Sequence, residues 1–272
     1  MPKDITVSLP DGNKKVLPSG SNGYDLASSI GSGLAKSAVA FRVGDNQFDL
    51  HDELQDETKV SIITIQSDEG LEIMRHTIAA QVLASAIKNL FPKSKLAIGP
   101  TIENGFYYDI LFDTPISSDD LDKIEKEMRN IIKNGGFIKK SLHSKADALS
   151  KFKKNQETYK LKIIEESNQS KDFQIYTQED SGFIDLCKGP HLPSLSFVGE
   201  FKLLSIAGAY WQGDSNNEML TRIYGTAWRT KKELSDHLTQ IEEAEKRDHR
   251  KLAKEMDLFH FQDEAPGMVF WH

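Results

Sequence analysis

The chain has 272 residues, a formal net charge of −7 and 38% hydrophobic residues. This length suits about two domains, at the usual ~100–200 residues each. The negative charge argues against nucleic-acid binding over the whole surface, and no run approaches the ~18 apolar residues that cross a bilayer. A single cysteine excludes an internal disulfide, and no basic segment followed by an apolar one marks the N-terminus for secretion. We therefore expect a cytoplasmic protein without membrane association.

The first 64 residues have the pattern of a small mixed domain. Residues 5–9 alternate apolar and polar side chains, Pro-Asp-Gly-Asn follows as a turn, and residues 15–17 return, which is typical of a β-hairpin. A short helix is expected at 24–30, and strands at 38–43, 47–50 and 59–65. This order predicts a ubiquitin-like (β-grasp) domain. It contains no catalytic cluster, so we interpret it as a binding or spacer module.

A larger α+β part follows a polar junction at residues 67–70. An amphipathic helix is expected at 71–90, with His76 in its first turns and Ala80 one turn later on the same face. Residues 96–109 have the pattern of a strand, a turn and a strand. Phe106 and Tyr108 are core residues by default, and a tyrosine hydroxyl at the mouth of a pocket is the alternative. A second amphipathic helix at 117–133 ends at a glycine pair, and the basic stretch after it is expected to continue as helix to residue 166.

Lysines are concentrated between residues 139 and 162, where eight of them face only Asp147 and Glu157. A second basic cluster lies at 246–254. A solvated surface is the ordinary explanation for either cluster, but the phosphate backbone of a nucleic acid binds the same residue types. Both explanations remain open at this point.

The side chains best suited to chemistry lie in the stretch Asp185-Leu186-Cys187-Lys188-Gly189-Pro190-His191. Gly-Pro between the thiol and the imidazole excludes a helix, so we expect a tight loop that turns Cys187 and His191 toward one point. His76 offers a second imidazole. With Asp185, these groups suit either hydrolytic proton transfer or metal ligation. For His76 alone, a packed structural histidine is the ordinary alternative.

The last third of the chain contains two predicted strands and a helix. Residues 207–214 and 220–228 combine small and aromatic residues, as in a sheet approached closely by a ligand or another backbone. Thr230 and Glu233 form a capping box, and apolar residues up to Phe259 predict a long linker helix over 229–260. The apolar run that follows resembles a strand without a partner, as at the beginning of a further domain.

Taken in order, these motifs resemble the N-terminal half of bacterial threonyl-tRNA synthetases essentially from end to end. The stretches that carry the resemblance are 75–76, 98–100, 104–109, 185–191, 208–211, 214–217, 222–228, 246–250 and 265–272. The resemblance implies a TGS-type domain at 1–64, an editing domain shared with alanyl-tRNA synthetases at 65–228, a linker helix at 229–260 and the start of a class II catalytic domain at 261–272. ATP, magnesium and zinc are expected only for that catalytic domain, and a homodimer only for the full-length protein.

The resemblance also implies an editing site that hydrolyses seryl-tRNA(Thr), with tRNA(Thr) as the partner. His76 and His191 are expected to position or deprotonate a water, while Cys187 and Asp185 shape the pocket and hold the substrate amine. Substrate contacts are expected from Lys160, Tyr107, Gly99 and Trp211.

The sequence departs from the family at one position of this site. The family's His-x-x-x-His motif ends here in Ala80, which removes one polar group from the pocket. Only three potential ligands remain for a four-ligand zinc site, and bacterial editing sites of this family work without metal, so no metal is expected.

Two other functions fit the same motifs. A free-standing editing hydrolase would carry them without needing the linker helix. A non-catalytic RNA-binding module would bind tRNA through residues 139–162 with a steep salt dependence and no turnover.

Overall fold

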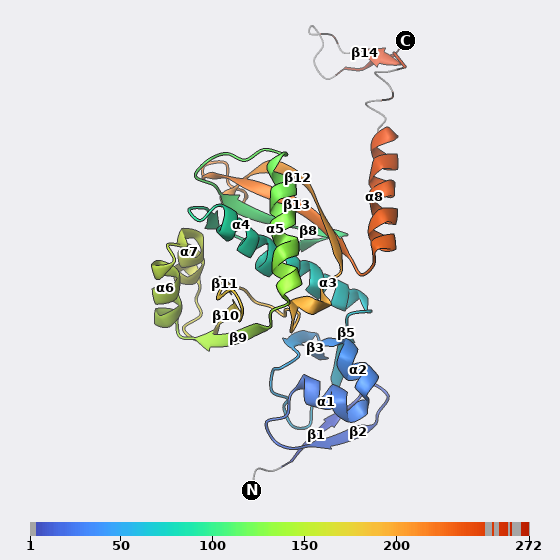
Figure 1. Cartoon of the computed structure of the whole chain (residues 1–272), viewed down its shortest axis with the longest axis vertical. Helices are drawn as coiled ribbons and strands as arrows, with labels where there is room; N and C mark the ends of the chain where they lie inside the picture. The colour runs from blue at the N-terminus through green and yellow to red at the C-terminus, as the bar shows by residue number, and fades with distance from the viewer. Residues whose placement is uncertain (1–3, 248–251, 253–255, 261, 263–267, 272) are drawn as a thin grey trace. The chain divides into compact units, whose positions relative to one another are not determined.

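The computed structural model describes residues 4–247, 252, 256–260, 262 and 268–271. The chain divides into two compact units, Met1–Arg229 and Thr230–His272. Within the described ranges, no helix is long and apolar enough to cross a membrane. The larger unit contains both predicted domains and the whole of the candidate site (Figure 1).

The larger unit begins with a β-grasp arrangement, which confirms the predicted α+β class. Its strands are β1 (Ile5–Ser8), β2 (Lys14–Leu17), β3 (Ala38–Val43), β4 (Asn46–Asp49) and β5 (Val60–Thr64). The hairpin β1–β2 forms as predicted, and Ser8 bridges in parallel to Lys59, just before β5. β3 pairs with both β4 and β5. Helix α1 (Gly23–Ile30) begins at a capping box on Asn22 and is followed by a short α2 (Ser32–Ser37), which the sequence pattern does not predict.

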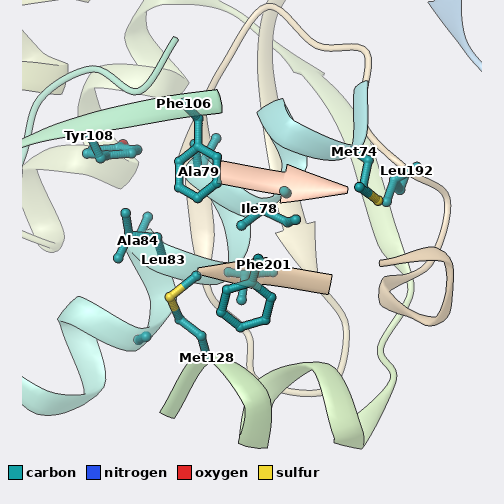
Figure 2. Close-up of a cluster of buried hydrophobic side chains, with 14 of the residues drawn as sticks. Met74, Ile78, Ala79, Leu83, Ala84, Phe106, Tyr108, Met128, Leu192 and Phe201 are labelled. Atoms are coloured by element: carbon teal, nitrogen blue, oxygen red, sulfur yellow. The ribbon is translucent and has the colours of Figure 1, made fainter. Parts of the chain in front are cut away.

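The predicted helix at 71–90 is a continuous run with an unexpected middle. It consists of α3 (Asp68–Thr77), a π-helix (Ile78–Leu83) and α4 (Ala84–Leu90), and Ser67 caps its N-terminus. Every residue of the π-helix is buried. In Figure 2 the π-helix residues Ile78, Ala79 and Leu83 lie among core side chains contributed by strands and by α5. This helix is therefore the centre of the core, and a wider turn begins directly after His76 and Thr77.

An antiparallel sheet in the order β12-β13-β8-β6 packs against this helix. Its strands are β6 (Lys95–Leu96), β8 (Gly105–Leu111), β12 (Glu200–Tyr210) and β13 (Met219–Trp228), and the short β7 (Thr101–Ile102) pairs with β8. Helix α5 (Asp120–Asn134) packs on α4 and β12 and ends at Gly135, whose φ of 71° supplies the left-handed C-cap. Figure 1 shows α5 lying across this layer.

A second, smaller sheet forms one side of the candidate site. β10 (Phe173–Gln178) lies between β9 (Ile138–His143) and β11 (Ile184–Leu186), and α6 (Lys145–Lys154) and α7 (Thr158–Glu166) pack together beside it (Figure 1). The prediction of helix from the glycine pair to residue 166 is therefore wrong. The segment begins as a strand, Ser144 caps a new helix, and Gln156 with φ 56° interrupts the helical stretch before α7.

The smaller unit begins with α8 (Lys231–Lys246), on the predicted Thr230–Glu233 capping box. The prediction of one helix over 229–260 is wrong at its far end, because Phe259 belongs to strand β14 (Phe259–His260). The C-terminal run is not unpaired either, since β15 (Phe270–Trp271) pairs with β14. Most of the basic cluster at 246–254 and of the predicted catalytic-domain segment at 261–272 lies outside the described residues.

Candidate active site

A cavity of about 480 Å³ opens between the central helix, the loop before β7, α7 and the stretch after β11. Its walls include most of the residues singled out in the sequence. The polar and small side chains that the following argument uses are His76, Ala80, Gly99, Tyr108, Lys160 and Cys187. Because these residues come from five separate stretches, the cavity exists only in the folded chain.

His76 and Cys187 are in direct contact at this cavity. The distance between His76 Nε2 and Cys187 Sγ is 2.8 Å. Burial lowers the pKa of the His76 imidazole, and a hydrogen bond to the backbone of Gly99 together with the charge of Asp185 opposes that shift. The ring is therefore neutral at pH 7, and its Nε2 accepts a hydrogen bond from the thiol. A nucleophile-type side chain and a base are thus paired, and the base is oriented by a third group.

The His191 ring stacks on the His76 ring. The ring centroids are 4.7 Å apart and the planes are inclined by 7°. The Thr77 hydroxyl donates to the Ile73 carbonyl, so its oxygen accepts from the backbone N–H of Leu192 and from His191 Nδ1 at 3.2 Å. This contact places a proton on His191 Nδ1. Among the described residues, the buried Nε2 of His191 has no hydrogen-bond partner.

The loop between Cys187 and His191 has the tight path that its sequence predicts. The Gly189–Pro190 peptide is cis, and Gly189 has φ +65°. A Cβ at Gly189 would lie 1.9 Å from the Tyr176 hydroxyl, so only glycine fits there. Leu192, which follows the loop, is fully buried in the main core, and Figure 2 labels it with Met74. The core thus fixes one end of the loop and β11 fixes the other.

Lys160 and Asp185 form a buried ion pair at the base of the cavity. Lys160 Nζ lies 2.6 Å from Asp185 Oδ1, and the two side chains are 4% and 2% exposed. Lys160 also donates to the Tyr108 hydroxyl and to the Leu186 carbonyl, which uses all three of its protons. Asp185 accepts from Lys160, from Tyr108 and from the N–H of Leu186. Lys160 has no N–H left for a substrate, and three of the roughly four acceptor sites of Asp185 are filled, so the pair mainly holds the walls in place.

Burial dominates the electrostatics of this pair. It raises the pKa of Asp185, while the neighbouring Lys160 ammonium opposes that rise. Burial, with the adjacent Asp185 charge, also raises the pKa of Tyr108 well above its usual range. Tyr108 is therefore a neutral hydrogen-bond donor to Asp185 over the whole physiological pH range.

The structure brings some of the predicted site residues together and leaves others apart. His76, Cys187 and His191 converge, with their nitrogen and sulfur ligand atoms within 4.8 Å of one another. Gly99, Lys160 and Asp185 line the cavity with His76 and Cys187, whereas His191 is buried behind His76 and is not a lining residue.

Tyr107 and Trp211, the two other predicted substrate contacts, are not among the lining residues. Side chains alternate along β8, so Tyr107 faces away from the cavity and packs on Arg222 at 3.8 Å. Trp211 is buried against Tyr159 in a separate cluster. The strand neighbour Tyr108, a core residue by default, lines the cavity where Tyr107 was expected to do so.

Sequence reasoning also missed three residues that shape the site. Thr77 orients His191, Tyr176 packs edge-on against the His191 ring at 4.4 Å, and Asp49 accepts a hydrogen bond from the His191 backbone. The proximity of Thr77 to His76 was the only signal in the sequence for any of them. Asp49 lies in the domain that we had interpreted as a spacer.

The lysine-rich segment 139–162 is not one basic face. Lys139 pairs with Glu179, Lys140 with two carboxylates of the β-grasp domain, and Lys160 with Asp185. Lys145 donates to the backbone carbonyls at the end of α7. The exposed remainder lies on α6 and α7: Lys151, Lys153, Lys154 and Lys162.

A cysteine and two histidines could also hold a zinc ion with one open coordination position. In tetrahedral zinc geometry, with the usual bond lengths, a thiolate sulfur and an imidazole nitrogen on one ion lie about 3.5 Å apart. The observed 2.8 Å between Cys187 and His76 is shorter than that and fits a shared proton better than a shared metal. The donor set suits zinc, but its present spacing does not.

Comparison with known proteins gives two domain matches and several close relatives. The TGS domain family matches residues 5–64, and the threonyl and alanyl tRNA synthetase second additional domain matches residues 174–224. A threonine–tRNA ligase of Citrifermentans bemidjiense is 50% identical over 99% of this chain and 42% of its own length. Those of Geobacter sp. strain M21 and Francisella philomiragia are 50% and 48% identical, each again over 42% of its length. The chain thus spans about two-fifths of the curated relatives it matches.

The fold and the site therefore define a chain with the accessory domains of an aminoacyl-tRNA synthetase, a TGS domain followed by an editing-type domain. Across nearly its whole length, this chain is a homologue of the N-terminal part of threonine–tRNA ligases.

Proposed function

We propose that this chain is the editing part of a threonine–tRNA ligase and that it hydrolyses the ester of seryl-tRNA(Thr). One observation carries the proposal: His76 and Cys187 are in direct contact at the wall of the cavity, and the buried His191 ring stacks on His76. ATP, magnesium, zinc and a homodimer are expected of the whole ligase, whose aminoacylation activity we assign to the part beyond these domains.

An editing site of this kind would improve the discrimination between threonine and serine. Serine lacks one methyl group of threonine, and a binding pocket gains only ~1–3 kcal/mol from a methyl, or roughly 10–200-fold. A second site that admits the smaller amino acid and removes it raises the overall fidelity. Tyr108, Gly99 and Ala80 line the cavity and provide walls for a small side chain. The neutral, hydrogen-bonded Tyr108 ring is the rigid part of this wall.

The proton route follows from the resting hydrogen bonds. A water attacks the ester carbonyl, and His76, neutral at pH 7, takes its proton on Nε2 in place of the thiol proton. The His191 ring, stacked on His76 at 4.7 Å, holds the His76 imidazole in the orientation that this transfer needs. The bond between the carbonyl carbon and the ribose oxygen then breaks, and His76 returns the proton to that oxygen.

Lysines on the exposed faces of α6 and α7 suit the tRNA backbone. Lys151, Lys153, Lys154 and Lys162 are exposed, and α7 also provides wall residues of the cavity. Phosphate contacts by these lysines predict a binding affinity that falls steeply with salt concentration. Neutralising all four should weaken tRNA binding and lower the slope of log K against log salt by up to ~4 × 0.7–0.9.

The test is single-turnover deacylation of seryl-tRNA(Thr) and threonyl-tRNA(Thr) by this chain and by Ala80→His. Faster release of serine than of threonine by the wild-type chain supports the proposal. The added imidazole of Ala80→His lies on the same helix face as His76 and is expected to increase the rate. If neither protein hydrolyses seryl-tRNA(Thr) while both bind it, the chain is a tRNA-binding module and the catalytic assignment is wrong.

A further inference from the structure

The β-grasp domain contributes directly to the geometry of the candidate active site. We infer that Asp49, at the end of β4, is a positioning residue for His191 and that the TGS domain is therefore a structural component of the editing site. The inference deepens the proposed function and rests on it for the kinetic part of its test. It was not predictable from the sequence, because the two residues lie 142 positions apart.

Asp49 accepts two hydrogen bonds, one from the main chain of His191 and one from a side chain that packs on the His191 ring. Its Oδ1 accepts the backbone N–H of His191 at 2.9 Å. Its Oδ2 accepts the hydroxyl of Tyr176 at 2.7 Å, and the Tyr176 ring lies edge-on against the His191 ring at 4.4 Å. One carboxylate thus fixes both the main chain of His191 and the aromatic side chain that packs on its ring.

The contact with Asp49 restrains the main chain of the loop directly at His191. Pro190 has no N–H, so the N–H of His191 is the first main-chain donor after Gly189. The next donor, the N–H of Leu192, is bound to the Thr77 hydroxyl. Two consecutive N–H groups are therefore held by side chains from two separate parts of the chain. Together they determine the direction in which the His191 side chain leaves the backbone.

Further ion pairs and hydrogen bonds surround Asp49 where it meets the loop. Lys140 on β9 pairs with Asp49 at 3.0 Å and also with Asp52, and its side chain is only 17% exposed. Asp52 in turn accepts the backbone N–H of Asp49. Lys140 and Asp52 thus join the same two parts of the chain as Asp49, but neither has a hydrogen bond to His191 or to Tyr176 among the described contacts. These two residues therefore provide matched controls.

Loss of the Asp49 carboxylate should affect chemistry more than binding. The substrate cavity is lined by other residues, so the KM for seryl-tRNA(Thr) should change less than twofold in Asp49→Ala. A shift of the His191 ring by about 1 Å costs roughly 10²-fold in rate, and we expect kcat to fall by roughly 10- to 100-fold. Asp49→Asn keeps an oxygen that can accept the His191 N–H, so it should restore most of the rate.

The experiment compares Asp49→Ala, Asp49→Asn, Tyr176→Phe and the control Lys140→Met in the full chain, with folding checked by circular dichroism. Single-turnover deacylation gives the rate, and ¹⁵N-detected NMR of the imidazole gives the tautomer of His191. We expect the Nδ1–H tautomer in the wild-type chain, in Asp49→Asn and in Lys140→Met, and a mixture of tautomers in Asp49→Ala. Tyr176→Phe, which keeps the ring but loses the hydroxyl, should lie between these results.

Two results would overturn the inference. One is an Asp49→Ala protein with the wild-type tautomer and kcat. The other is a Lys140→Met protein that loses as much rate as Asp49→Ala, since that would make Asp49 a docking residue only. If Asp49→Ala does not fold, Tyr176→Phe still decides the matter, because a wild-type tautomer and a wild-type rate in that variant would contradict the inference. The NMR readout does not depend on turnover, so it separates this inference from a failure of the proposed function.

Discussion

The buried pair of Lys160 and Asp185 gives a quantitative prediction for stability. Removing one member, in Lys160→Met or Asp185→Asn, leaves the other in a site where the two side chains are 4% and 2% exposed. Breaking a buried pair in this way destabilises a protein by ~3–5 kcal/mol, because the remaining group loses its partner but not its desolvation. Replacing both at once removes the uncompensated charge, so the double variant should be more stable than either single variant by at least ~2 kcal/mol.

The pKa of Asp185 gives this prediction a pH dependence. Burial raises that pKa above the unfolded value, and in Lys160→Met no ammonium opposes the rise. An acid whose folded pKa is raised loses stability as the pH increases through that folded pKa, because the unfolded state then ionises more readily. Lys160→Met should therefore be least stable at high pH, whereas Asp185→Asn should not show this added loss.

Urea unfolding followed by tryptophan fluorescence can measure both effects, since Trp211 packs on Tyr159, the neighbour of Lys160 in the chain. The measurement uses the wild-type chain, both single variants and the double variant at pH 5 and pH 8. The reasoning would be refuted if each single variant lost less than ~1 kcal/mol, or if the losses simply added in the double variant.

Three further predictions concern the site itself. Since burial lowers the pKa of His76 below 6.5, the acid limb of the pH–rate profile for deacylation should have its midpoint below pH 6.5, and a midpoint near 7.5 would contradict the assignment of the base. Gly99→Ala places a Cβ 2.1 Å from the Tyr108 ring, so it should destabilise the chain by ~1–3 kcal/mol and reduce serine deacylation, whereas an unchanged urea midpoint would show that the ring moves freely. In the proposed water route Cys187 forms no thioester and no metal is required, so rapid-quench mass spectrometry should find no seryl adduct and a zinc chelator should not lower the rate. A trapped adduct would make Cys187 the nucleophile.

The sequence predicted correctly those helices and strands whose apolar residues recur with a regular helical or strand spacing. The β1–β2 hairpin, the strand Ala38–Val43, the central helix and the capping box on Thr230 appear where alternation, helical spacing and cap residues place them. The π-helix could not be predicted, because its six residues fit an ordinary helical pattern and only the packing around them widens the turn. The prediction of helix for residues 138–143 is wrong because this stretch shows no regular alternation of apolar and polar residues that would indicate a strand.

Much of the candidate site was visible in the sequence, but its geometry was not. The Gly-Pro loop predicted that Cys187 and His191 would face one point, and the helical run upstream offered His76 as a second imidazole. The family resemblance then assigned all three to one site. Tyr107 and Tyr108 point to opposite faces of the sheet, and the register of β8 determines which one faces the cavity. The sequence alone does not give that register, and the prediction named Tyr107. Asp49 carried no signal, since its role depends entirely on how the β-grasp domain meets the loop.

The most direct measurement of the central claim is a crystal structure of this chain with a non-hydrolysable amide analogue of 3′-seryl-adenosine. Our account predicts that the seryl group lies in the cavity beside Tyr108, with its carbonyl carbon within ~4 Å of a water that contacts His76. A seryl group bound elsewhere, or a carbonyl separated from the His76 imidazole by the width of a side chain, would contradict the account.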